Sequence, residues 1–206
     1  MFSLFLRGFA LGLAVAASPG PIFFLCVRRT LTQGRLIGLF SGFGVATADG
    51  FYAAVATFGI AALTTAFASG RRPLAVIGGA VLVVLGARIL LERGLAPRPA
   101  TAPTGRGLAW AYFSTLGLTI TNPATIVSFA ALAATLGLGT GGSPLRPGSV
   151  VAGVLLGSAA WWGVLVIGAT ILRARLTPRV VGWISAVSGV AIAVLGILAV
   201  VSAFST

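Results

Sequence analysis

Residues 36–65 read LIGLFSGFGVATADGFYAAVATFGIAALTT, a run whose only charged side chain is Asp49. About 20 apolar residues in a helix cross the hydrocarbon core of a bilayer, so this run is long enough to span it. The apolar residues are continuous rather than alternating, which is typical of a membrane helix and not of a barrel strand. The stretch therefore predicts an all-α integral membrane protein.

The rest of the chain has the same character. Of its 206 residues 58% are hydrophobic and 8% are charged, whereas a soluble domain carries about 25% charged residues. Apolar runs predict six transmembrane helices, at Gly8–Val27, Leu36–Thr65, Pro73–Leu91, Gly107–Leu136, Ser149–Leu172 and Val180–Ala203. The first run is predicted to be a span and not a cleaved signal peptide, because it continues well past the small residues around Ala16.

All 14 basic residues are Arg, and they lie between the apolar runs rather than among stacking aromatics, which argues against nucleic-acid binding. The first, third and fifth connections hold ten of them, and the opposite side holds four. Basic residues stay on the cytoplasmic side, so both termini are expected outside. The absence of Lys beside abundant Ala and Gly suggests a GC-rich bacterial genome. We expect the protein in the bacterial inner membrane.

A Pro- and Arg-rich segment, residues 92–106, is too polar to be a span and divides the chain into two groups of three helices. Residues 1–91 form the first group and residues 107–206 the second. Because three is odd, related halves would enter the membrane in opposite orientations as two inverted three-helix repeats. Two pairs of motifs support a relation: Ser18-Pro19-Gly20-Pro21 with Thr121-Asn122-Pro123, and Gly38-x-x-x-Gly42 with Gly153-x-x-x-Gly157. The alternative is that Pro and Gly are simply common in membrane helices.

Asp49 lies near the middle of the second span, where a charged group costs about 2.5–3.5 kcal/mol. It shares a helix face with small residues, which pack against protein rather than lipid. Tyr52, three residues on, could hydrogen-bond to the carboxyl. An acid that gains and loses its proton as access alternates suits a proton-coupled carrier, and an ionised Asp49 could instead pair with a substrate ammonium. The alternative is a structural, protonated Asp bonded to a neighbouring helix.

The paired motifs predict broken helices around a binding site. Proline removes a backbone donor, and the half-helix that begins at Pro21 presents a partial positive end. Such breaks suit a substrate with both a carboxylate and an ammonium group. Trp161 could hold the ammonium on its ring face, although helix packing explains it equally well. The candidate substrate- and proton-binding residues are Asp49, Ser18, Pro19, Gly20, Pro21, Tyr52, Thr121, Asn122, Pro123 and Trp161.

With no His, one Cys and two acids, the chain has almost no ligands for a transition metal, and a lone Cys26 excludes an internal disulfide. Neither a metal site nor a cofactor is expected. No nucleophile–base pair or metal motif indicates an enzyme.

Through the motifs quoted above, the sequence resembles the LysE/RhtB family of bacterial amino-acid exporters over essentially the whole chain. The matching elements are Ser18-Pro19-Gly20-Pro21, Gly42-Phe43-Gly44 leading to Asp49-Gly50, Asn122-Pro123, and Gly153 and Gly157 with Trp161-Trp162. The resemblance implies antiport of protons against amino acids or related small metabolites leaving the cytoplasm. Family members usually carry a Lys where Ala124 stands, and without an intramembrane base the substrate carboxylate is left to helix ends and polar groups.

Two other hypotheses remain open at this stage. A metal-ion or other inorganic-ion exporter of the same architecture would draw on Asn122, Thr121, Ser18 and freed carbonyls beside Asp49. A non-transporting membrane scaffold would need Asp49 only for stability or partner binding. The lipid bilayer, protons and a small-molecule substrate are the expected partners, and a homodimer is left open.

Overall fold

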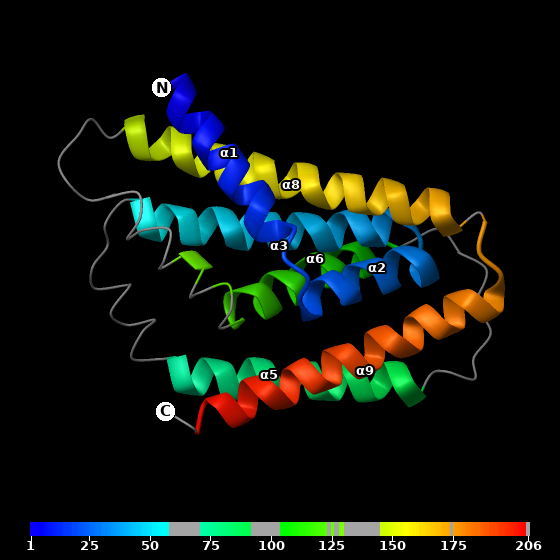
Figure 1. Ribbon diagram of the computed structural model, residues 1–206. Helices are drawn as coiled ribbons and strands as arrows, with labels where there is room; N and C mark the ends of the chain where they lie inside the picture. The colour runs from blue at the N-terminus through cyan, green and yellow to red at the C-terminus, as the bar shows by residue number, and fades with distance from the viewer. Residues whose placement is uncertain are drawn as a thin grey trace.

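The structure is a computed structural model that describes residues 1–57, 71–91, 104–122, 125, 128–129, 145–173 and 175–204. Every extended regular element in these residues is an α-helix, as the sequence predicts (Figure 1). The helices are α1 (Phe2–Ala16), α2 (Pro21–Gln33), α3 (Arg35–Thr57), α5 (Arg71–Leu91), α6 (Gly105–Ile120), α8 (Leu145–Arg173) and α9 (Pro178–Ser202). Pro123, Ala124 and most of the 92–106 segment lie outside the described residues.

Three helical segments within this part of the chain are long and apolar enough to cross a bilayer: Arg35–Thr57, Gly148–Arg173 and Arg179–Ser202. Helices α1 and α2 pass the same test together, as a pair bent by 79°. The apolar part of α5, Ala75–Leu91, is shorter. The fold is therefore that of an all-α membrane protein, and the number of six spans stays a prediction.

The first predicted span is two helices rather than one. Helix α1 ends at Ala16, and Gly20 adopts an extended conformation (φ −145°, ψ −177°) before Pro21 opens α2. Proline fits the first turn of a helix, where its missing N–H is not needed, but it interrupts a helix that tries to continue through it. The sequence predicted this disruption, but the helical bounds of Gly8–Val27 were wrong, since helix extends from Phe2 and on to Gln33.

A one-residue turn joins α2 to α3. Gly34 has φ 99°, the left-handed region that favours glycine, and its N–H donates to the Thr30 carbonyl at 3.2 Å. The chain therefore folds straight back, and α2 runs antiparallel along the start of α3. Arg29, five residues before the turn, lies opposite Ser41, seven residues after it.

Glycines set the closest helix contacts. Helix α8 packs on α1 and α3, α3 also packs on α6, and α5 pairs with α9 (Figure 1). A Cβ on Gly157 of α8 would overlap the Phe9 carbonyl of α1, and one on Gly44 of α3 would overlap the Tyr112 carbonyl of α6. Small residues let membrane helices approach this closely, and they replace the hydrophobic driving force that lipid cannot supply.

Candidate functional site

Asp49 lies at the contact between α3 and α8. Its side chain is 2% exposed, and its Oδ2 accepts a hydrogen bond of 2.7 Å from the Ser158 hydroxyl on α8. Ser158 is itself fully buried. Gly42 and Gly50, on either side of Asp49 along α3, leave room for side chains of α8. In this conformation the carboxyl is shielded from bulk water.

The predicted hydrogen bond from the Tyr52 hydroxyl to Asp49 was wrong, because the hydroxyl donates elsewhere. The Tyr52 hydroxyl donates to the carbonyl of Ile120, the last residue of α6, and its ring stacks on Phe129 with centroids 5.8 Å apart. A hydroxyl has one proton to donate, so the bond to Ile120 excludes donation to the carboxyl. Tyr52 instead joins α3 to the end of α6, about one helical turn from Asp49.

The second predicted break begins where expected, because α6 ends at Ile120. The Thr121 hydroxyl donates back to the Gly117 carbonyl at 3.0 Å, and the Asn122 N–H donates to the Thr119 carbonyl at 3.2 Å. These bonds close the last turn of the helix. Through Tyr52 the broken end of α6 comes near Asp49, while Pro123 lies outside the described residues.

The first break is less closely engaged with Asp49. Ser18 and Pro19 are exposed, Gly20 is half-buried and Pro21 is buried. Within the described structure the backbone bonds here stay local: the Ser18 N–H donates to the Val15 carbonyl at 3.2 Å. The structure therefore places Ser18 and Pro19 at the bend and not against the carboxyl.

Both tryptophans of α8 have a buried indole N–H for which the described residues supply no acceptor. Trp162 is 3% exposed and packs with Val45 of α3 and Cys26 of α2, and the half-buried Trp161 packs beside them. An unmade buried hydrogen bond costs about 1–3 kcal/mol, so unpaired donors in a protein interior call for an explanation.

A functional candidate that the sequence interpretation missed is Arg29 on α2, which is 5% exposed. Its Nη1 donates to the Ser41 hydroxyl at 3.0 Å and to the Ala111 carbonyl at 3.2 Å, and its Nη2 donates to the Ser114 hydroxyl at 2.9 Å. From the sequence, Arg29 was counted among the cytoplasmic orientation signals and was given no role in the site. The signal was present, because Ile22, Cys26 and Arg29 share one face of a helix.

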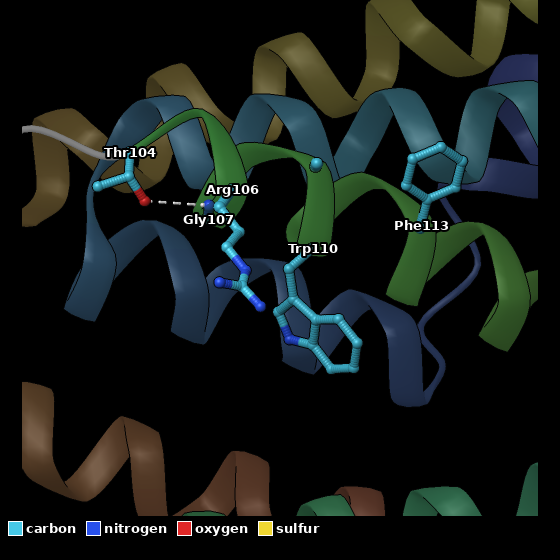
Figure 2. A pocket seen from close by; sticks show the side chains of 6 residues that line it. Thr104, Arg106, Gly107, Trp110 and Phe113 are labelled. Carbon is cyan, nitrogen blue, oxygen red and sulfur yellow. Dashed lines mark hydrogen bonds between the residues drawn. The ribbon is translucent and has the colours of Figure 1, made fainter.

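A surface pocket on α6 is separate from these residues. It is lined by Thr104, Arg106, Gly107, Ala109, Trp110 and Phe113. Figure 2 shows Thr104 accepting a hydrogen bond from the Gly107 N–H, at 3.2 Å, with the Arg106 and Trp110 side chains beside each other. Trp110 and Phe113 are 69% and 64% exposed. Aromatic and Arg side chains on an outer helix face are typical of a membrane–water interface, and nothing here reaches Asp49.

Replacing Ser158 with Ala is expected to destabilise the protein by about 1–2 kcal/mol, because the buried carboxyl of Asp49 would lose its hydrogen-bond donor. Ser202→Ala, at the exposed end of α9, is the matched control. Thermal unfolding of the purified protein in detergent measures both. Equal midpoints for the two variants would show that the contact contributes nothing.

The described residues contain no group of three or more His, Cys, Asp or Glu side chains that could hold a metal ion. Among the described residues, the one side-chain oxygen bonded to the Asp49 carboxyl is the Ser158 hydroxyl, which leaves too few ligands for a hard cation, since that takes six or more oxygens.

Comparison with known families gives a match over most of the chain. The model of the LysE type translocators matches residues 13–203. Two relatives are the uncharacterized membrane protein YahN of Escherichia coli (strain K12) and the chemotactic transduction protein ChpE of Pseudomonas aeruginosa.

The extent of these two matches differs. YahN is 32% identical over 114 residues, which cover 54% of this chain and 51% of that protein, so about half of each is aligned. ChpE is 29% identical over 163 residues, 78% of this chain and 79% of ChpE. No solved structure matches the chain significantly.

Proposed function

This chain belongs to the LysE type translocator family, and on that premise we propose that it is a secondary transporter exporting amino acids or related small metabolites in exchange for protons. The observation that carries the proposal is the buried carboxyl of Asp49 at the contact of α3 and α8. Ionisable groups kept inside membrane proteins are rare, and they mark ion and substrate pathways.

One carboxyl can perform the exchange. A proton entering from outside neutralises Asp49, and its release to the cytoplasm leaves a carboxylate that can pair with a substrate ammonium. Because proton and ammonium compete for the same group, each leaves before the other binds, which is the condition for antiport. The closed state of Asp49 in this conformation fits a carrier that opens to one side at a time.

The proposal includes two inverted repeats, residues 1–91 and 107–206, joined by residues 92–106. The packing of α8 against α1 supports the repeat, because the packing of α3 against α6 is its counterpart. Gly157 lies against the Phe9 carbonyl, as Gly44 lies against the Tyr112 carbonyl. Phe9 and Tyr112 each stand nine positions before the break motif of their half, Ser18 and Thr121.

The contacts between α5 and α9 independently support the same relation between the two halves. A Cβ on Gly86 would meet the Gly189 carbonyl, and one on Gly196 would meet the Gly79 carbonyl, both at 2.7 Å. Let each residue of α5 change places with the α9 residue a fixed number of positions later, so that Gly86 becomes Gly196. Gly189 then becomes Gly79, and the first contact becomes the second. Repeats of opposite orientation commonly carry the site of a transporter at their interface, near the bilayer midplane.

These contacts shift the correspondence that the sequence motifs suggest. Gly157 pairs with Gly44 and not with Gly42, since Gly42 contacts the Trp162 side chain instead. Asp49 and Trp162 each follow their glycine by five residues, so Asp49 corresponds to Trp162. Under the proposed repeat the second half therefore carries an indole where the first carries an acid.

For the orientation we propose the bacterial inner membrane with both termini outside, from the Arg distribution. Substrate release would then be toward the side of the termini. Arg29 no longer counts toward this bias, because it is buried among helices, but nine basic residues still oppose four.

A non-transporting role in a membrane assembly is the second candidate, favoured by the name of the relative ChpE, a chemotactic transduction protein. It assigns Asp49 to helix association through Ser158 and predicts no solute flux.

Purified protein in liposomes preloaded with each of the 20 amino acids tests the proposal. Lowering the external pH by one unit is expected to drive efflux of at least one of them toward an approximately tenfold gradient for one-for-one exchange, and a protonophore should stop it. Liposomes without protein are the control. Efflux no faster than in the control for every amino acid would contradict export of amino acids and favour the second candidate.

A further inference from the structure

Arg29 is a buried cation whose hydrogen-bond acceptors in the described structure are all uncharged: two hydroxyls and a carbonyl. The described residues contain one acid, Asp49, and its carboxyl is bonded to Ser158 instead. Buried charges in proteins are normally paired, because the loss of hydration costs several kcal/mol. An uncompensated guanidinium inside a helix bundle is therefore suited to an anion that comes and goes.

The contacts of Arg29 leave part of the guanidinium unused. Of its five N–H groups, both on Nη1 and one on Nη2 are bonded within the described structure. The remaining two are on Nη2 and Nε, which are the nitrogens that bind the two oxygens of a carboxylate side-on. Ser114 and Ser41 hold the group in place without neutralising it.

Arg29 of α2 is bonded to the same face of α3 that carries Asp49. Ser41, which holds Arg29, and Asp49 are eight residues apart, about 12 Å along the helix. Val45 lies midway on that face and packs against Trp162, whose indole N–H has no acceptor among the described residues. This face thus runs from a cation, past an unpaired donor, to an acid.

We propose that Arg29 is the residue that binds the carboxylate of the exported solute. The inference rests on the proposed function and assigns a further binding residue to its site. The carboxylate and ammonium of an α-amino acid are attached to one carbon, so a single molecule cannot reach Arg29 and Asp49 together. The solute meets the two groups in succession, and the Trp162 N–H offers a hydrogen bond between them.

Binding of a carboxylate without an amino group tests this step apart from transport. The probes are 4-methylpentanoate and its neutral amide, 4-methylpentanamide, added to the purified full-length protein in detergent while the melting temperature is followed. We expect saturable stabilisation by the carboxylate and none by the amide. Arg29→Gln should weaken carboxylate binding at least tenfold, and Arg28→Gln, whose wild-type side chain bonds to Ser185 on α9, should bind like the wild type.

Three results would overturn the inference: no carboxylate binding by the wild type, unchanged binding by Arg29→Gln, or an equal loss in Arg28→Gln. If Arg29→Gln does not fold, Arg29→Lys replaces it, because Lys keeps the charge and loses the fork. That variant is expected to bind about tenfold more weakly, and unchanged binding again overturns the inference. Carboxylate binding without amino-acid export would contradict the proposed function alone.

Discussion

Gradient-driven export is expected to fall at least about 100-fold when Asp49 is replaced by Asn. The amide has nearly the same shape and can still accept the hydrogen bond from Ser158, so the helices should pack as before. It cannot release a proton or pair with an ammonium, and losing a buried charged partner costs about 2–5 kcal/mol. Efflux from preloaded liposomes under an imposed pH difference measures the loss.

Phe43→Leu is the matched control for this experiment. Phe43 is on the same helix, but it is 48% exposed and so lies on a different face from the buried Asp49. Its efflux should equal that of the wild type. If Asp49→Asn exports as fast as Phe43→Leu, the carboxyl carries neither protons nor substrate, and its role is the structural one.

The second large effect concerns stability. Gly157→Ala is expected to lower the free energy of unfolding by about 1–3 kcal/mol, because the added Cβ would overlap the Phe9 carbonyl and push α1 away from α8. Gly163→Ala, on the same helix, adds its Cβ where no atom lies within 4 Å. That control should be neutral or stabilising by up to about 1 kcal/mol, since Ala favours helix over Gly.

Thermal unfolding followed by size-exclusion chromatography in detergent compares the two variants. Equal midpoints would show that α1 and α8 can separate without loss, and that the close backbone approach is not needed. The comparison is informative because both changes add the same methyl group to one helix.

The features that the sequence predicts correctly have local causes. Pro21 cannot continue a helix from α1, so the break follows from one residue type. The burial of Asp49 follows from its position among small residues on one helix face. Neither prediction requires knowledge of which helices are neighbours.

The features that it misses depend on tertiary contacts. Tyr52 has the right spacing to reach Asp49, but the Ile120 carbonyl of another helix takes its proton. Ser158 carries no signal in the sequence that sets it apart from other small residues of its helix. Both assignments need the order in which helices pack.

Arg28 and Arg29 illustrate the same limit for charge. The sequence treats the two alike, as cytoplasmic orientation signals. Adjacent helical residues point about 100° apart, so one reaches Ser185 on α9 while the other enters the contact of α3 with α6.

The contact between Val45 and Trp162 has a consequence for ancestry. If the two halves are related as proposed, Val45 is the counterpart of Ser158 and Trp162 is the counterpart of Asp49. An ancestor made of two identical three-helix chains would have carried its acid twice, at about 2.5–3.5 kcal/mol for each insertion. Fusion into one gene removes that obligation, since either copy can then mutate alone. A fused gene can carry an acid at one of the two equivalent positions and an indole at the other, whereas a symmetric dimer of identical chains cannot.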